Sequence, residues 1–215
     1  MFFQLDDASD APFPDPSLAE TDPDGLLAMG GDLTVTRLIN AYKSGVFPWF
    51  NKGEPLLWWS PDPRLVLFPE KIHISKSLKK IIRQKRFQIT MNQCFEQVIH
   101  ACSEPRVGES QTWISEDMKN AYVNLHQAGF AHSFEVWRDN QLVGGLYGVE
   151  VNQAFFGESM FSRESNTSKI ALAALTDYAQ TKDLKCIDCQ VSTTHLRSMG
   201  AIEISRADFL SLLQR

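Results

Sequence analysis

The chain has 215 residues, a length typical of one large domain or two small ones. Hydrophobic residues make up 43% and charged residues 22%, a balance that excludes a disordered or fibrous protein. The formal charge of -5, from 21 basic and 26 acidic residues, argues by itself against a nucleic-acid partner. No apolar run reaches the roughly 20 residues that span a bilayer, and no signal peptide is recognisable, so we expect a cytosolic protein without membrane contact.

Residues 1–90 are predicted to form a small N-terminal domain. Its first 24 residues hold seven acidic residues, no basic ones and four prolines, which favours an extended path along a surface. An aromatic, proline-rich stretch occupies 47–64. The predicted elements are a helix between Asp32 or Thr34 and Gly45, a strand over 65–68, and a helix from Ser75 or Ser77 to about Lys85.

Residues 91–215 are predicted to form a larger C-terminal domain. An antiparallel meander followed by a β-α-β unit predicts a mixed α/β sheet. A polar loop is expected over 103–112. The predicted elements are helices capped by Asn92 and Ser115, strands over 132–137, 142–149 and from 154, a helix over 166–179, a strand over 185–191, and helices over 195–200 and 206–213.

Glu158 stands at the end of a predicted strand, in Gly157-Glu158-Ser159-Met160. If this carboxyl is desolvated, its pKa rises, and it can act as an acid or base or hold an amine or a ribose hydroxyl. A solvated loop carboxylate remains the alternative.

Asp188 and Gln190 are two residues apart in a predicted buried strand, so we expect them to face the same side. Polar groups on a buried strand need partners, because unpaired burial is costly. At the carboxyl end of a strand they suit a ligand site in an α/β sheet, or else a polar network inside the core.

Four of the five tryptophans, Trp49, Trp58, Trp59 and Trp113, are candidates for stacking on nucleobases. The alternative is that they cover a small core beside the prolines. Cys186 and Cys189 have C-x-x-C spacing, but no second pair follows and buried thiols are the favoured interpretation. Gly144-Gly145 lacks the pattern of a dinucleotide fingerprint and indicates close backbone packing or a bulge.

Residues 71–86 carry seven basic residues and no acidic one, so the rest of the chain holds 14 basic and 26 acidic residues. Within this segment Lys76, Lys79, Lys80 and Arg83 share one helix face. Such a face favours contact with a phosphate backbone, although a solvated surface has the same pattern. The net charge therefore does not exclude a nucleic acid.

Several long motifs together resemble the leucyl/phenylalanyl-tRNA–protein transferase family, and the match covers residues 13–215. The matching segments are 24–33 (DGLLAMGGDL), 45–50 (GVFPWF), 57–64 (LWWSPDPR), 132–137 (HSFEVW), 143–148 (VGGLYG), 157–162 (GESMFS) and 187–190 (IDCQ).

The resemblance implies an enzyme that moves Leu or Phe from aminoacyl-tRNA to the α-amino group of proteins beginning with Arg or Lys. The product is marked for degradation by the bacterial N-degron pathway. It also implies a C-terminal domain similar to the N-acetyltransferase (GNAT) fold, and no metal or redox cofactor. We expect a monomer.

The resemblance also implies site residues. Gln190 lies near the reacting amine or carbonyl and Asp188 orients it, while Glu158 contacts the aminoacyl amine or the terminal ribose. Trp49 and Trp113 hold the terminal adenosine. The implied aminoacyl pocket consists of Leu146, Phe155, Met160, Leu172, Leu175 and Ile187. A hydrophobic pocket discriminates weakly, so Met-tRNA is a further candidate donor. The implied tRNA-stem contacts are Lys76, Lys79, Lys80, Arg83, Lys85 and Arg86.

Two other functions compete with this interpretation. One is an acetyl-CoA N-acetyltransferase, which would need a pyrophosphate-binding R/Q-x-x-G-x-G/A turn before a helix; residues 163–168 lack it. The other is a non-catalytic RNA-binding module. Turnover with charged Leu-tRNA distinguishes it from an enzyme.

Overall fold

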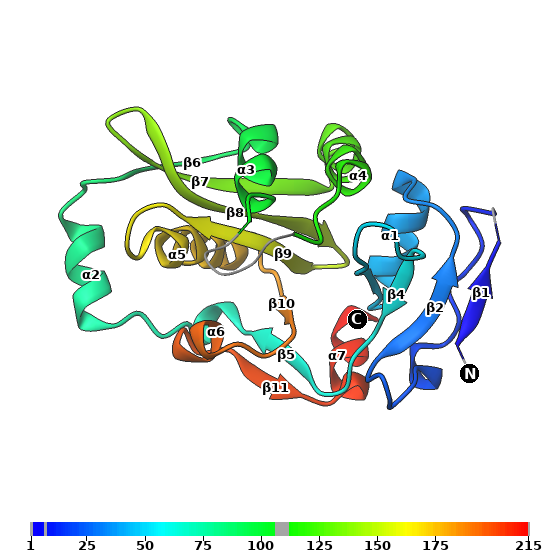
Figure 1. Cartoon of the computed structure of the whole chain (residues 1–215). Coiled ribbons are helices and arrows are strands. Elements are labelled where there is room, and N and C mark those ends of the chain that lie inside the picture. The colour runs from blue at the N-terminus through cyan, green and yellow to red at the C-terminus, as the bar shows by residue number, and fades with distance from the viewer. Residues whose placement is uncertain (1, 7, 106–111, 215) are drawn as a thin grey trace.

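The computed structural model describes residues 2–6, 8–105 and 112–214 of the chain. The strands form two sheets, one of four strands and one of seven (Figure 1). Most of the loop predicted over 103–112 lies outside the described residues.

The smaller sheet is built from the N-terminal part of the chain. Its strand order is β1-β2-β4-β3, with bounds β1 Phe3–Leu5, β2 Leu26–Gly30, β3 Phe47–Pro48 and β4 Leu57–Trp59. Helix α1 (Val35–Lys43) joins β2 to β3. It begins as predicted, because the Thr34 hydroxyl accepts a hydrogen bond from the Arg37 amide, and it is followed by Gly45 at φ 72°.

The larger sheet is mixed, which confirms the predicted α/β class. Its strand order is β11-β5-β10-β9-β8-β7-β6, with bounds β5 Arg64–Leu67, β6 Gln88–Met91, β7 Ala131–Arg138, β8 Gln141–Val151, β9 Ala154–Ser162, β10 Cys186–Gln190 and β11 Ile202–Ile204. Strands β6 to β9 run antiparallel to one another, whereas β9 and β10 are parallel and connected through helix α5 (Thr167–Thr181).

Helices cover both faces of the larger sheet. On one face, α5 packs against β7, β8 and β9; on the other lie α3 (Phe95–Cys102) and α4 (Glu116–Gln127). Alternation along β8 separates the two cores, because Leu146 packs in the α5 core and Tyr147 in the α3 core. Gly144 allows α5 to approach closely, since a Cβ there would lie 2.3 Å from the Thr167 hydroxyl. This agrees with the close packing predicted for the glycine pair.

Three further α-helices complete the described part of the fold. They are α2 (Lys76–Arg83), α6 (Thr194–Ser198) and α7 (Arg206–Leu213). Helix α2 lies at the end of the molecule opposite the smaller sheet (Figure 1). Ser75 caps α2 and Ser115 caps α4, as predicted, each by accepting a bond from a backbone amide.

Two predictions about the N-terminal half differ from the structure. The chain passes from the smaller to the larger sheet between Trp59 and Arg64, so β5 and β6 belong to the sheet expected to begin after residue 90. One continuous core also contains residues of both sheets. Asn92 does not cap α3, because its backbone is left-handed at φ 58° and its carboxamide oxygen instead accepts from the Ser133 amide.

Candidate active site

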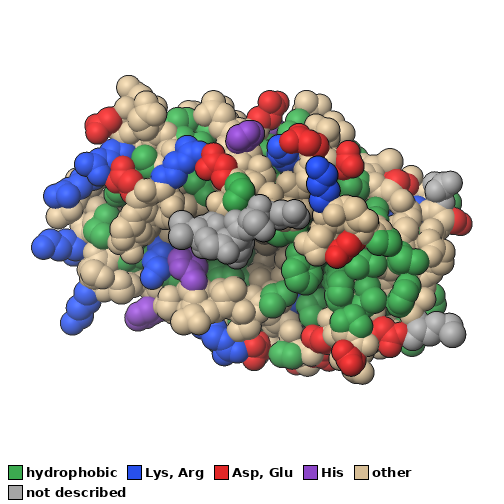
Figure 2. Space-filling view, in the orientation of Figure 1, with side chains coloured by type: hydrophobic (Ala, Val, Ile, Leu, Met, Phe, Trp, Pro, Cys, Tyr) green, Lys and Arg blue, Asp and Glu red, His purple; other side chains and the backbone are tan. Residues whose placement is uncertain are grey.

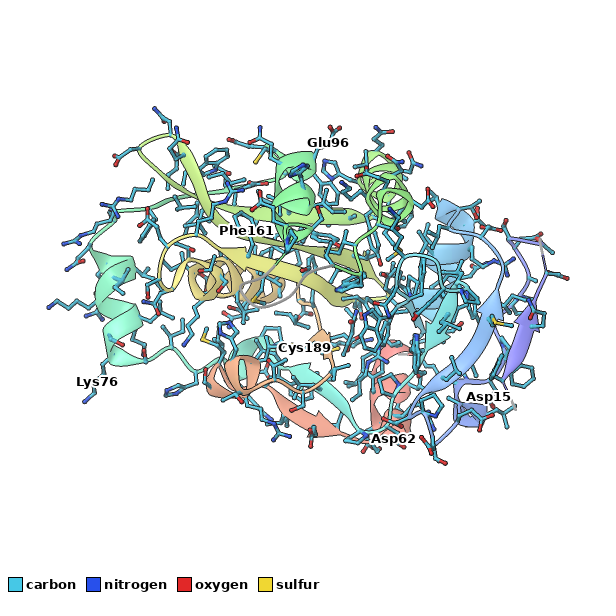
Figure 3. The ribbon with its side chains drawn as sticks, in the orientation of Figure 1. Asp15, Asp62, Lys76, Glu96, Phe161 and Cys189 are labelled. Atoms are coloured by element: carbon cyan, nitrogen blue, oxygen red, sulfur yellow. The ribbon has the colours of Figure 1, made fainter. Side chains whose placement is uncertain are left out.

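A cavity of about 480 Å³ opens where two parallel strands separate. Strands β9 and β10 pair only from Ala154 to Phe156, opposite Cys186 to Asp188. Beyond that point β9 continues beside β8, and the residues after each paired segment line the cavity. Carboxyl ends of parallel strands are the usual ligand-binding edge of α/β sheets. Figure 3 locates Cys189, one residue before Gln190, near the middle of the molecule.

Both strands are irregular at this point. The pairing of β9 with β8 skips Glu158, and the pairing of β10 with β5 skips Cys189. Bulges of this kind re-aim side chains and are common beside active sites. The backbone of Gln190 is left-handed, at φ 59°, a region that non-glycine residues seldom occupy.

Glu158 lies in the cavity wall and accepts hydrogen bonds from three side chains, of which only Gln190 also lines the cavity. The Tyr42 hydroxyl donates to Oε1 at 2.9 Å, the Tyr122 hydroxyl donates to Oε2 at 2.8 Å, and the Gln190 Nε2 donates to Oε1 at 3.0 Å. As a residue, Glu158 is 9% exposed. Burial raises its pKa to about 7, against the opposing effect of the hydrogen bonds from Tyr122 and Tyr42. The Glu158 carboxyl is therefore desolvated, as predicted, and both its protonated and its ionised forms are populated near neutral pH.

Asp188 lies behind this wall, not in it. Its carboxylate accepts two hydrogen bonds from the Arg64 guanidinium, at 2.8 and 2.7 Å, and both side chains are fully buried. Its Oδ1 also accepts from the Gln190 backbone amide at 2.9 Å. Gln190 lines the cavity and Asp188 is not among its lining residues. That both side chains face the same side stays a prediction. The left-handed backbone at Gln190 breaks the alternation of the strand.

The tryptophans divide between the cavity and the core, and stacking on nucleobases stays a prediction for those at the cavity. Trp49 and Trp113 line the cavity, and Trp49 is 46% exposed. Trp58 is a core residue, since it is fully buried and its indole nitrogen donates to the Gly30 carbonyl. Trp59 supports Trp49, because its indole nitrogen donates to the Trp49 carbonyl at 2.6 Å and the two rings lie 5.8 Å apart.

Five of the six residues expected in the aminoacyl pocket line the cavity: Leu146, Met160, Leu172, Leu175 and Ile187. Three of them come from the sheet and two from α5. The sixth, Phe155, is not among the lining residues; it is fully buried in the core, with its ring centroid 6.1 Å from that of Phe134. The cavity thus has an apolar wall adjoining the Glu158–Gln190 pair.

The basic residues of 76–86 lie apart from this cavity. All six predicted contacts are exposed, and the structure records no ion pair between them and any described residue. Lys and Arg side chains gather at the end of the molecule where α2 lies, whereas hydrophobic side chains gather towards the other end (Figure 2). Lys76 marks this basic end in Figure 3. These side chains are free to meet an anionic partner.

Sequence reasoning missed three residues that hold the polar wall: Tyr42, Tyr122 and Arg64. Tyr42 lies in the helix predicted between Asp32 or Thr34 and Gly45, and a buried tyrosine hydroxyl needs a partner. That requirement was the available signal.

The hydroxyl of a third tyrosine, Tyr147, is buried in the cavity wall without a hydrogen-bond partner among the described residues.

Comparisons with known proteins agree on one family. The family model for the leucyl/phenylalanyl-tRNA protein transferase matches residues 66–214, and the model for its N-terminal domain matches residues 31–62. Proteins named leucyl/phenylalanyl-tRNA–protein transferase include one from Cellvibrio japonicus, 53% identical over 94% of this chain and 86% of its own length. Another, from Pseudomonas fluorescens, is 54% identical over 94% of this chain and 89% of its own.

A solved structure of a GCN5-related N-acetyltransferase-like protein from Streptococcus suis matches 75% of this chain and 60% of that chain, with 14% identity and a TM-score of 0.43. Among the described residues, no helix has both the length and the apolar character needed to cross a membrane. The structure has a mixed α/β sheet with a cavity beyond the carboxyl ends of two parallel strands, and the family matches define the chain as a transferase. The chain belongs to the leucyl/phenylalanyl-tRNA–protein transferase family.

Proposed function

We propose that this chain transfers a leucyl or phenylalanyl group from aminoacyl-tRNA to the α-amino group of proteins that begin with Arg or Lys. Met-tRNA is a further candidate donor. The carrying observation is the cavity, in which the buried Glu158 and the half-buried Gln190, joined by a hydrogen bond, adjoin an apolar wall and two tryptophans. The product is a protein with a new N-terminal Leu or Phe, which marks it for the N-degron pathway.

The apolar wall receives the side chain of the transferred amino acid. Leucine and phenylalanine differ in shape, and Met160 suits both because its unbranched side chain adapts to either. A wall of aliphatic groups distinguishes apolar side chains by only a few kcal/mol at most, about 1–3 per methylene. The exposed face of Trp49 and the face of Trp113 stack on the terminal adenosine of the tRNA.

The reaction needs orientation more than activation, because the aminoacyl ester is already reactive. The acceptor amine attacks the ester carbonyl, a C–N bond forms, and the C–O bond to the ribose breaks. One proton moves from the amine to the departing ribose oxygen. Because Gln190 Nε2 donates to Glu158, its carbonyl oxygen is left to accept a hydrogen bond from the attacking amine. A neutral amide is a weak base, so Gln190 positions the amine.

Glu158 supplies the ionisable group beside this amide. With a pKa raised by burial to about 7, it is partly ionised at neutral pH, and the ionised form attracts an ammonium group in the cavity. In this role it holds the amine of the aminoacyl group or the terminal ribose hydroxyl.

The tRNA stem docks on α2 and the residues after it, through Lys76, Lys79, Lys80, Arg83, Lys85 and Arg86. Exposed cations without acidic partners contact phosphates and release counterions. Phosphates carry no base identity, so these contacts fix the position of the stem without reading its sequence. The acidic remainder of the chain favours a cationic acceptor N-terminus and confines tRNA to this end.

The test is a transfer assay with purified protein, Leu-tRNA and a peptide that begins with Arg. The peptide is expected to gain the mass of one leucine residue. A peptide beginning with Glu and a reaction with uncharged tRNA plus free leucine serve as controls and should gain nothing. No gain on the Arg peptide refutes the proposal. Acetylation of that peptide by acetyl-CoA would favour the N-acetyltransferase alternative instead.

A further inference from the structure

The Arg64 guanidinium contacts one carboxylate and two aromatic rings. Its Nε and Nη2 donate to the two oxygens of Asp188 at 2.8 and 2.7 Å. Its Cζ lies 4.7 Å from the ring centroid of Phe47 and 4.7 Å from that of Phe209. A guanidinium that contacts two aromatic rings and is forked onto a carboxylate is closely restricted in orientation. Arg64 therefore fixes the carboxylate of Asp188 in turn.

The fixed carboxylate holds the backbone at the cavity. Asp188 Oδ1, which accepts from Arg64 Nε, also accepts from the backbone amide of Gln190 at 2.9 Å. Gln190 has a left-handed backbone, which is strained for a residue with a Cβ and persists only where its surroundings enforce it. From this conformation its side chain reaches Glu158. A chain of hydrogen bonds thus runs from Arg64 through Asp188 to Gln190 in the cavity wall.

We propose that Arg64 is a positioning residue of the transferase site: held in contact with Phe47 and Phe209, it fixes Asp188 so that Gln190 keeps the left-handed conformation that places its amide beside Glu158. The inference rests on the proposed function. It makes Asp188 a support for Gln190 that touches no substrate, because Asp188 is fully buried and does not line the cavity. It also gives the C-terminal helix α7, through Phe209, a part in the geometry of the site.

A purely structural ion pair is the rival explanation. Removing one partner of any buried pair destabilises a protein, so lost activity alone does not separate the two. The chain offers a matched control in Arg37, which is 1% exposed, lies 3.6 Å from Asp32 and donates to the Asp6 carbonyl. Arg37 does not line the cavity.

The experiment compares Arg64→Met with Arg37→Met in the Leu-tRNA transfer assay, with rates corrected for the folded fraction measured by circular dichroism. Arg64→Met is expected to lower kcat at least about tenfold while KM for Leu-tRNA changes less than about threefold, because binding groups stay in place and orientation is lost. Arg37→Met is expected to keep its kcat even if it melts earlier. Equal kcat values in the two variants overturn the proposal.

Arg64→Lys keeps the protein testable if the methionine variant does not fold. It retains the positive charge, so Asp188 is not left unpaired, but a single ammonium cannot fix both carboxylate oxygens. We expect a folded protein with kcat at least about threefold lower. Unchanged kcat in this variant overturns the proposal.

A structural readout separates this inference from the proposed function. Crystal structures of wild-type protein and Arg64→Lys are compared at Gln190. The variant is expected to lose the left-handed backbone or the hydrogen bond to Glu158, which is 3.0 Å long in the wild type. An unchanged Gln190 refutes the positioning role even if the enzyme reacts. An inactive wild-type protein refutes the proposed function, and the comparison of Gln190 still decides the role of Arg64.

Discussion

The cavity wall and helix α2 present charge in opposite ways. Around the cavity, Arg64, Asp188 and Glu158 are buried and each has partners at hydrogen-bond distance. On α2 the basic side chains are exposed and lack ion pairs with described residues. Buried charges interact strongly over short distances, whereas exposed charges act over about a Debye length and are weakened by salt. One region can position reacting atoms, and the other can gather and hold a polyanion.

The largest expected effect concerns the buried carboxyl. The pKa of Glu158 is raised from 4.5 to about 7 in the folded protein, so the folded state binds the proton more tightly than the unfolded state. Stability that is present below pH 4.5 is therefore lost as the pH rises through 7. The loss is about 3 kcal/mol. Urea unfolding of wild type and Glu158→Gln between pH 4 and 8 should show this difference in pH dependence.

The same variant checks the site itself. Glu158→Gln keeps the shape of the side chain and cannot ionise, so we expect turnover at least about tenfold lower than wild type, a loss of roughly 1.4 kcal/mol. If the two proteins lose stability in parallel with pH and turn over equally, Glu158 is a passive wall residue.

Next in size is the aromatic contact at the cavity mouth. Trp49→Ala should weaken aminoacyl-tRNA binding by about 1–3 kcal/mol, the effect of losing one base stack, and should appear in KM for Leu-tRNA. The folded protein should be little affected, since the side chain is 46% exposed. The matched control is Phe3→Ala, which removes another exposed aromatic ring. Phe3 lies in β1, at the edge of the smaller sheet opposite β3. If Trp49→Ala and Phe3→Ala have equal KM values for Leu-tRNA, Trp49 does not contact the tRNA.

Charge reversal on α2 tests the other region. Lys79→Glu with Arg83→Glu should flatten the dependence of log affinity for tRNA on log salt by about two units, roughly one for each lost phosphate contact. Affinity near physiological salt should fall about tenfold. Lys43→Glu with Lys182→Glu makes the same change in net charge elsewhere on the surface. An equal change in salt dependence in this control would mean that net charge, not the α2 face, attracts tRNA.

These two regions also differ in how far the sequence predicted them. The basic helix was predicted with its cap and its charged face, because both depend on residues within two turns of each other. Glu158 and Gln190 were predicted as polar residues at strand ends. The way the two side chains meet was not predicted, because it depends on strand bulges, and bulges depend on how neighbouring strands pair.

The missed partners have a common physical cause. Tyr42 is 116 positions from Glu158 in the chain, and Arg64 is 124 positions from Asp188. Contacts of this kind follow from the topology, and no local pattern contains them. The short strands of the smaller sheet were missed for a similar reason, since β2 pairs with β4 across α1 with a shift in register. Asn92 was misassigned because its side chain had a backbone partner on a distant strand.

The smallest expected effect separates charge from helix order within α2. Ser75→Ala removes the hydroxyl that accepts from the Leu78 amide and should destabilise the helix by about 1 kcal/mol. Ser75→Asp keeps a capping oxygen and favours the helix dipole, but it adds a negative charge to the basic face. If tRNA is held by the field of the exposed cations, the aspartate variant should bind tRNA more weakly than the alanine variant although its helix is better ordered. Binding is measured by filter binding at low salt. If the alanine variant instead binds tRNA more weakly than the aspartate variant, helix order controls binding. The kcat of both variants should equal that of the wild type, because Ser75 does not line the cavity.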